Sequence, residues 1–256
     1  MKYILEAENL TKVFKTQNKS YFTAVDSVSF KLEEGESLGI VGESGSGKST
    51  IARMLLRLTD VSDGKIYLYG EDITNFSGKN LRKVYGAIQM IFQSAEGSFN
   101  PRKTLGYSIC ESLRNLGMAG GEAKKRAEYL LEECGLNGEF LKKYPHEVSG
   151  GQCQRAAIAR ALAAQPKILV CDEATSALDV TVQKQIMELL TDLKNKNNLS
   201  YIFICHNLAL VQSFCDRVLV MSEGKIVEEG TPDEVIFSPK SSYTKILADA
   251  AIESSL

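Results

Sequence analysis

The sequence predicts an α/β fold, and three features of its pattern indicate this class. Two short runs, at 37–41 and 168–171, are almost entirely apolar, as is typical of parallel strands covered on both faces. A glycine-rich loop follows the first run, and a helical pattern follows the loop. From about 105 to 164 the apolar spacing is helical, which predicts a helical segment inserted between strands of a sheet.

Length and composition place the chain among ordinary globular proteins. Its 256 residues can bury one large core, or two lobes that share one. The net charge of −2 gives no electrostatic reason to expect nucleic acid or an anionic membrane surface as a partner. No apolar run approaches the length needed to span a bilayer, and the first residues lack a signal-peptide pattern. We therefore expect a soluble, cytoplasmic protein.

The cysteines are expected to be buried and reduced. They form no C-x-x-C pair and no cluster with metal-ligand spacing, and several lie in apolar runs. The six positions are Cys110, Cys134, Cys153, Cys171, Cys205 and Cys215. Neither a disulfide nor a metal site is predicted from them.

Strands and helices are predicted along the rest of the chain from alternation, apolar runs and turn residues. Strands are expected at 3–9, 24–32, 37–41, 65–69, 87–92, 168–171, 201–205, 217–221 and 225–228, the last two joined at Glu223-Gly224. Helices are expected at about 152–164, 182–193 and 243–250, and after the capping box that begins at Thr231. Residues 94–104 have no regular pattern.

The glycine-rich loop matches the phosphate-binding pattern G-x-x-x-x-G-K-[ST]. It consists of Gly42, Glu43, Ser44, Gly45, Ser46, Gly47, Lys48, Ser49 and Thr50. Glycines allow positive φ and let phosphate oxygens approach the backbone N–H groups, while the helix that follows points its positive dipole end at the anion. Lys48 can reach the β- and γ-phosphates, and Ser49 can bind Mg²⁺. A chance match arises in roughly 1% of chains of this length, and the strand–loop–helix context lowers that figure, so we predict nucleotide binding.

A second candidate element is the pair of carboxylates at the end of the apolar run 168–171. Ligands of open α/β sheets bind at the carboxyl ends of the strands, where Asp172 and Glu173 stand. Asp172 can hold Mg²⁺, and Glu173 can polarise an attacking water. By itself an Asp-Glu pair is more often a plain strand end; downstream of a phosphate-binding loop it favours nucleotide chemistry.

A third element is the run Ser149-Gly150-Gly151-Gln152, which opens a predicted helix. It has the character of a second phosphate-binding helix start, although a simple helix cap explains it equally well when it is taken alone. The glycine-rich loop already accounts for one triphosphate. A second anion-binding helix start therefore suggests that another phosphate group binds there.

With these elements in order, the sequence resembles the ATPase subunit of ABC transporters over nearly the whole chain. The run from Ser149 to Gln152 is similar to the family's signature motif, with Val148 where Leu is usual. The resemblance implies a P-loop core with an antiparallel β subdomain at its start and an inserted helical subdomain. It divides the chain into a domain at 1–240, with its core at 1–93 and 165–240 and its insert at about 94–164, followed by a tail at 241–256.

The resemblance also implies roles for other residues. Gln93 matches the glutamine that senses Mg²⁺ or the γ-phosphate and couples to the membrane subunit. Asp179 ends the D-loop match that begins at Ser176, His206 matches the switch histidine that contacts the γ-phosphate, and Phe14 takes the place of the aromatic that stacks on adenine. Tyr21 and Phe22 are rivals for the stacking role, and His206 taken alone would more often be a helix cap.

In the family two ATPs, each with Mg²⁺, are sandwiched between two subunits. The Ser149, Gly151 and Gln152 segment of one chain faces the phosphate-binding loop of the other. The resemblance therefore implies catalytic roles for Glu173, His206, Lys48 and Gln93, and an Mg²⁺ site that includes Ser49, Gln93 and Asp172. It implies a second ATPase subunit (a paralogue or a second copy), two membrane-spanning permease subunits and, indirectly, an extracytoplasmic binding protein. The expected place is the cytoplasmic face of the membrane.

A narrower resemblance is to the oligopeptide, dipeptide and nickel importer branch. It is carried by Phe92-Gln93-Ser94, by the stretch 98–105, by Tyr144-Pro145-His146-Glu147 and by Ser242-Tyr243-Thr244-Lys245. Ala95 stands where the branch usually has Pro, and Phe99 where it usually has Leu. Some members carry an iron–sulfur cluster in a longer tail with cysteines; here no cysteine follows Cys215, so none is predicted.

Two other classes of function compete with an importer subunit. A soluble ABC ATPase of DNA repair or translation usually has a coiled coil, a C-x-x-C hook or a second ATPase unit, and this chain has none of them. A kinase or another P-loop enzyme does not explain the run from Ser149 to Gln152. The cargo cannot be named from the sequence, because no residue here is expected to contact it.

Overall fold

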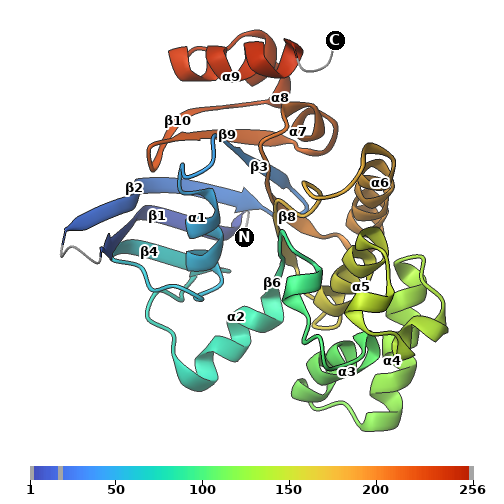
Figure 1. Cartoon of the computed structure of the whole chain (residues 1–256). Coiled ribbons are helices and arrows are strands. Elements are labelled where there is room, and N and C mark those ends of the chain that lie inside the picture. Colours follow the sequence, from blue (N-terminus) through green and yellow to red (C-terminus); the bar gives the residue numbers. More distant parts are fainter. Residues whose placement is uncertain (1–2, 17–19, 254–256) are drawn as a thin grey trace. The chain divides into compact units, whose positions relative to one another are not determined.

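The computed structural model describes residues 3–16 and 20–253 and divides the chain into two compact units (Figure 1). The first unit combines Met1–Val84 with Asn198–Leu256, and the second unit is Tyr85–Asn197. The second unit therefore interrupts the first in sequence, and it is longer than the helical insert predicted at about 94–164.

An antiparallel sheet opens the first unit. Its strands are β1 (Tyr3–Lys15), β2 (Tyr21–Glu33), β4 (Asp63–Leu68) and β5 (Glu71–Asp72), in the order β2-β1-β4-β5. β1 and β2 are longer than their alternating patterns predicted. The β1–β2 register shifts between Ala7 and Leu10, and both Asn9 and Ser27 have positive φ, which is the geometry of a bulge. A bulge breaks the period-two alternation of apolar and polar residues. The part of each strand beyond the bulge therefore could not be predicted from that alternation.

A second group of strands in the first unit supports the phosphate-binding loop. These are β3 (Ser37–Val41), β8 (Ser200–Ile204), β9 (Arg217–Ser222) and β10 (Lys225–Gly230). β3 lies between β8 and β9 and runs parallel to both, while β9 and β10 form the predicted antiparallel hairpin. β3 and β8 are buried along their whole lengths, which explains their apolar sequences.

Short helices complete the first unit. They are α1 (Lys48–Leu55), α7 (Leu208–Phe214), α8 (Pro232–Phe237) and α9 (Ser242–Glu253), with a 3₁₀ turn η1 (Gly78–Asn80). α8 begins with the predicted capping box, in which Thr231 Oγ1 accepts from the Glu234 amide and Glu234 Oε2 accepts from the Thr231 amide. α9 lies beside α8 and contacts β10.

The second unit is mostly helical. It contains the parallel strand pair β6 (Ile88–Ile91) and β7 (Ile168–Asp172). Its helices are α3 (Leu105–Asn115), α4 (Gly120–Glu133), α5 (Gly150–Leu162) and α6 (Val180–Asn197), with 3₁₀ turns η2 (Glu96–Ser98), η3 (Gly138–Lys142) and η4 (Pro145–Glu147). α2 (Leu81–Ala87) leads into it from the first unit. α5 contacts α3, α4, α6 and β6, so the helix that begins at the predicted signature run is central to this unit.

All six cysteines are free and buried, as the sequence predicted. Burial raises the pKa of Cys134 to about 12, and the neighbouring Glu133 adds to the effect. Within 3–16 and 20–253, every helix is too short or too polar to cross a lipid bilayer.

Candidate nucleotide site

The glycine loop joins β3 to α1 in the first unit, and its backbone requires glycine at two points. Gly42 has φ of +147°, and a Cβ there would stand 2.1 Å from the carbonyl oxygen of Met221. Gly47 has φ of +103°, and a Cβ there would stand 2.4 Å from the carbonyl oxygen of Ala24. Larger residues would push the loop off the strands that support it, so the loop depends on glycine for its shape as well as for its access to ligand.

The first turn of α1 is open to an anion. Gly47 is its N-cap residue and offers no side-chain cap, and no acidic residue lies in the first turn. The first N–H groups of a helix have no partner within the helix, and the helix dipole favours negative charge there. This is the environment that a phosphate group requires.

Lys48 points back over the loop that it follows. Its side chain is only 4% exposed. Its Nζ donates to the carbonyl oxygens of Gly42 (2.8 Å) and Glu43 (2.6 Å) and lies 3.2 Å from Ser46 Oγ. The ammonium group is thus held inside the curve of the loop, where phosphate oxygens would replace carbonyl oxygens as its acceptors.

His206 follows β8, and its neighbour supplies the helix cap. Asn207 Oδ1 accepts from the amides of Ala209 (2.9 Å) and Leu210 (3.4 Å) at the start of α7. The capping role that competed for His206 therefore belongs to Asn207. Because β8 runs parallel to β3 with Ile204 opposite Ile40, His206 and the glycine loop follow the same edge of the sheet.

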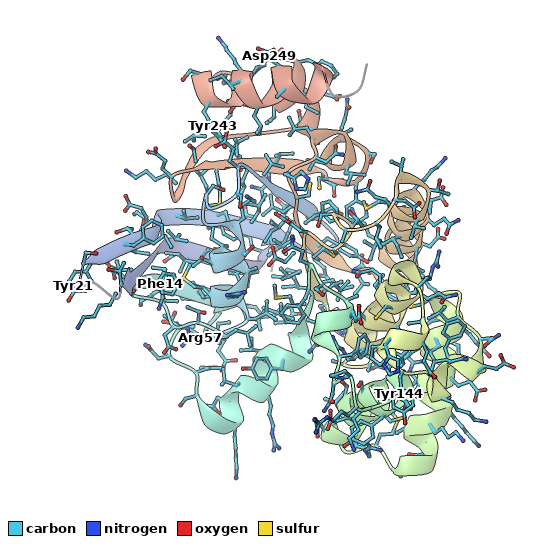
Figure 2. The ribbon with its side chains drawn as sticks, in the orientation of Figure 1. Phe14, Tyr21, Arg57, Tyr144, Tyr243 and Asp249 are labelled. Atoms are coloured by element: carbon cyan, nitrogen blue, oxygen red, sulfur yellow. The ribbon has the colours of Figure 1, made fainter. Side chains whose placement is uncertain are left out.

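The aromatic candidates lie together near one end of the antiparallel sheet. Phe14 on β1 is the register partner of Phe22 on β2, and Tyr21 pairs with Lys15. Figure 2 shows Phe14 and Tyr21 at this end of the two strands. Phe14 is 40% exposed and Tyr21 is 74% exposed, so both rings are open to a stacking ligand. The structure leaves Phe14, Tyr21 and Phe22 as candidates.

In the second unit the two adjacent strands bring Gln93 and Glu173 together. β6 and β7 run parallel with Ile91 opposite Cys171, so the residues after each strand meet at one edge. Gln93 Nε2 donates to Glu173 Oε2 at 2.6 Å. Eighty positions separate the two residues, and only the strand pairing joins them.

Glu173 begins a tight turn after the strand. Its φ of +48° lies in the left-handed region, which is uncommon outside glycine and is typical of functional turns. Its carbonyl oxygen accepts from the amide (3.1 Å) and the hydroxyl (3.0 Å) of Ser176. Asp172, immediately before it, is 7% exposed. The turn therefore holds one carboxylate deep at the strand end and directs the other toward Gln93.

The predicted signature run opens α5 with a capping box. Ser149 Oγ accepts from the Gln152 amide at 3.3 Å, and Gln152 Oε1 accepts from the Ser149 amide at 2.9 Å. The helix cap, which was the alternative to phosphate binding, is thus present. The cap uses the amide of Gln152, while the amides of Gly150 and Gly151 also lie in the first turn of the helix. A Cβ on Gly151 would stand 2.5 Å from Val182 Cγ1 on α6, so this glycine also permits close helix packing.

Asp179 has a structural partner of its own. Its Oδ1 accepts from the amide of Val182 at 2.9 Å, which caps the start of α6. In this structure its carboxylate therefore fixes the turn between Glu173 and α6.

A cavity of about 370 Å³ lies beside Gln93 within the second unit. The turn after Glu173 lines it with Ala177, and the start of α5 lines it with Val148 and Gly150. Gln93, the signature run and the turn after β7 thus border one space.

Arg160 is a residue that the sequence reasoning missed. Its guanidinium donates to Ser98 from two nitrogens, to the carbonyl oxygen at 2.7 Å and to Oγ at 2.8 Å, and stacks 4.2 Å from the centre of the Phe99 ring. Burial lowers the pKa of Arg160, with the nearby Cys153 opposing the shift. Through these contacts Arg160 joins the segment after Gln93 to α5. The available signal was the position of this arginine between the buried Ala159 and Ala161.

Each unit contains oxygen donors of the kind that Mg²⁺ prefers. Ser49 of the first unit has a hydroxyl. In the second unit, Asp172 has a carboxylate and Gln93 has an amide oxygen that its bond to Glu173 does not use. No group of three or more His, Cys, Asp and Glu side chains in the described part of the chain could hold a metal by itself. Mg²⁺ does not require one, because it commonly binds through one or two side chains together with substrate phosphates.

Comparison with solved structures confirms the predicted fold. The chain is similar to the ATP-binding cassette MJ0796 in a dimeric post-hydrolysis state bound to ADP and Pi, with a TM-score of 0.81 and 29% identity over 89% of this chain and 98% of that one. It is equally similar, at a TM-score of 0.81 and 26% identity, to cbiO1 from Clostridium perfringens over 100% of this chain and 94% of that one. Fold and loop together define an ATP-binding cassette.

Sequence comparison places the chain in a family. The ABC transporter family matches residues 25–176. The oligopeptide transport ATP-binding protein OppF of Salmonella typhimurium is 47% identical, covering 89% of this chain and 69% of the relative. The dipeptide transport ATP-binding protein DppF of Lactococcus lactis is 44% identical, covering 96% and 80%. The glutathione import ATP-binding protein GsiA of Salmonella paratyphi A is 48% identical, covering 89% of this chain but 37% of its own length.

The chain belongs to the ABC transporter family. Within the family its relatives are those of the oligopeptide and dipeptide branch, as the run after Gln93 and the motif around Tyr243 indicated.

Proposed function

We propose that this chain is the ATP-hydrolysing subunit of an ABC importer, and that short peptides are its cargo. The relatives named for oligopeptide, dipeptide and glutathione transport support this function. In this proposal residues 1–240 act as one ATPase domain on the cytoplasmic face of the membrane. The chain works with a second ATPase subunit, two membrane-spanning permease subunits and an extracytoplasmic binding protein.

The observation that carries the proposal is the 2.6 Å bond between Gln93 and Glu173. Glu173 is the carboxylate that we assign to the attacking water. Gln93 begins the segment that Arg160 ties to α5 through Ser98. A movement of this segment would therefore reach the side chain that orients the water, which is what coupling of hydrolysis to another protein requires.

Catalysis is assigned to positioning and charge stabilisation. The loop amides and Lys48 hold the β- and γ-phosphates of ATP, and Glu173 orients or activates the water. Mg²⁺, held by Ser49, Asp172 and Gln93, would supply charge neutralisation of the phosphates when it is bound. His206 contacts the γ-phosphate, and Phe14 or a neighbouring aromatic stacks on adenine.

The amides at the start of α5 are assigned to a phosphate held by another subunit. The segment of Ser149, Gly151 and Gln152 would face the loop of the partner subunit, and the partner's equivalent segment would face Lys48. Asp179 would belong to the same contact. ATP then joins the two subunits, and hydrolysis releases them, so that closing and opening of the pair drives the permease.

The test is purification of the chain with its permease subunits, followed by an ATPase assay in vesicles. We expect hydrolysis to rise when the external binding protein carries a short peptide. Stimulation by a nickel chelate alone would reassign the cargo. Full activity without any permease subunit, together with salt-sensitive retention on DNA or ribosomes, would contradict the importer function.

A further inference from the structure

The C-terminal helix contacts the phosphate-binding loop through one side chain. The hydroxyl of Tyr243, in the first turn of α9, accepts a hydrogen bond from the backbone N–H of Glu43 at 2.9 Å. Both residues belong to the first compact unit. Figure 2 shows Tyr243 on the side of α9 that faces β10, with Asp249 on the side that faces away.

The start of α9 is anchored, so Tyr243 has a defined position. The two carboxylate oxygens of Glu228, on β10, accept from the amides of Lys240 and Ser241, each at 2.9 Å. Ser241 Oγ accepts from the Thr244 amide at 3.2 Å, and Thr244 is fully buried. β10, one strand of the β9–β10 hairpin, therefore fixes the helix that reaches the loop.

The peptide groups of Glu43 are held on both sides. Tyr243 accepts from the N–H, and Lys48 Nζ donates to the C=O at 2.6 Å. Further along the loop, the Gly224 amide donates to the carbonyl oxygen of Ser46 at 3.1 Å. The loop is thus held by the β9–β10 hairpin at one point and by α9 at another. A loop that is fixed before binding loses less entropy when its amides converge on a phosphate.

We propose that Tyr243 is a positioning residue of the nucleotide site. Its hydroxyl holds the Glu43 peptide where the chain leaves β3, and so keeps the following amides and Lys48 aligned for phosphate. The inference rests on the proposed assignment of 42–50 as the ATP-binding loop. Tyr243 acts through the backbone of Glu43, and the C-terminal helix is part of the framework of the site.

The test removes only the hydroxyl, with Tyr243→Phe in the full chain. We expect the Kd for MgATP to rise about 3- to 10-fold, the range for one net hydrogen bond. Amide hydrogen exchange over 42–47 should be faster in the nucleotide-free variant, while the melting temperature stays near that of the wild type. In the assembled complex, KM for ATP should rise with little change in kcat. Tyr85→Phe, on α2, is the matched control and should leave all of these quantities unchanged.

The outcomes separate this inference from the function on which it rests. Wild-type affinity together with unchanged exchange over 42–47 in Tyr243→Phe would overturn it. An affinity that falls only with a general loss of stability would assign Tyr243 to folding and would also overturn it. Ile246→Gly, at an exposed position of α9, lowers helix propensity and so reports what loosening of the helix alone does to MgATP binding. A wild-type chain that fails to bind MgATP would instead contradict the assignment of the loop.

Discussion

The two helices α1 and α5 begin at the glycine-containing motifs found in the sequence, and they differ in whether a side chain caps their first amides. α1 begins after Gly47, which has φ of +103° and supplies no side-chain cap. α5 begins after Ser149, which forms a capping box with Gln152. Neither helix has an acidic residue in its first turn. Both ends are therefore electrostatically suited to an anion, but only one lacks a cap of its own.

The difference indicates two kinds of phosphate site. The start of α1 has no side-chain cap, and Lys48 adds a buried positive charge beside it. The capped start of α5 is stable without a ligand and presents two small residues, Gly150 and Gly151, at its end. In the proposed function, the first helix end binds the chain's own nucleotide, and the second is a preformed surface to which another subunit brings a phosphate. This is the arrangement expected of a site completed between two subunits.

The largest effect is expected at the uncapped end. Lys48→Ala removes the positive charge that three contacts hold inside the loop. Loss of one such preorganised donor costs about 10²–10³ in rate, so we expect hydrolysis to fall at least that far and MgATP affinity to fall with it. Isothermal titration and a phosphate-release assay check this, with Lys125→Ala on α4 as the control. Retention of wild-type binding would show that the loop is not the triphosphate site.

Glu173→Gln should separate binding from turnover. The amide oxygen can still accept from Gln93, but it cannot activate water, so we expect hydrolysis in the full complex to fall by about 10²–10⁴. MgATP affinity should stay within about twofold, and an ATP-bound pair of subunits should accumulate on gel filtration. Glu188→Gln, on α6, is the matched carboxylate control. Unchanged hydrolysis in Glu173→Gln would remove this residue from the mechanism.

Ser149→Ala should affect the capped end alone. Loss of an N-cap lowers stability by about 1 kcal/mol, which thermal denaturation can measure. We expect the isolated chain to bind MgATP as the wild type does, because α1 holds that nucleotide. Hydrolysis in the assembled complex should fall, since the surface offered to the other subunit has changed. If the isolated chain lost affinity as Lys48→Ala does, the division between the two helix ends would be wrong.

The smallest effect concerns the support of α9. Burial opposes ionisation of Glu228, but hydrogen bonds from the Ser241 and Lys240 amides hold its pKa below the ordinary value of 4.5. The stability from this group is therefore present above pH 4.5 and is lost as the pH falls through the lower folded-state pKa. Glu228→Gln should cost about 1 kcal/mol at pH 7. Urea denaturation at neutral and acidic pH checks that the difference from wild type shrinks in acid; a constant difference would contradict the role of the charge.

Much of the fold, and the start of α1, could be predicted from local sequence patterns. The sequence predicted β3, the loop and α1 because each has a local signature, and it predicted the capping box of α8 for the same reason. It also placed Glu173 and Gln93 at strand ends. Their contact followed only from the pairing of β6 with β7, which joins segments that are far apart in sequence.

Other features had no local signal. The bulge near Asn9 interrupted the alternation that would have shown the full length of β1. Tyr243 was noticed only as part of a motif, because its partner Glu43 lies 200 positions away. The N-cap of α7 is Asn207, and Asn is a preferred N-cap residue. From the sequence we considered the neighbouring His206 for this cap and did not consider Asn207.

We propose that a second subunit completes the nucleotide site, and one titration tests this directly. The rate of MgATP hydrolysis per chain is measured as the wild-type chain is concentrated, alone and with its partner ATPase subunit. We predict a low rate for the dilute chain that rises with its concentration or on addition of the partner. A rate per chain that is full in dilute solution, and constant across the titration with and without the partner, would contradict the claim.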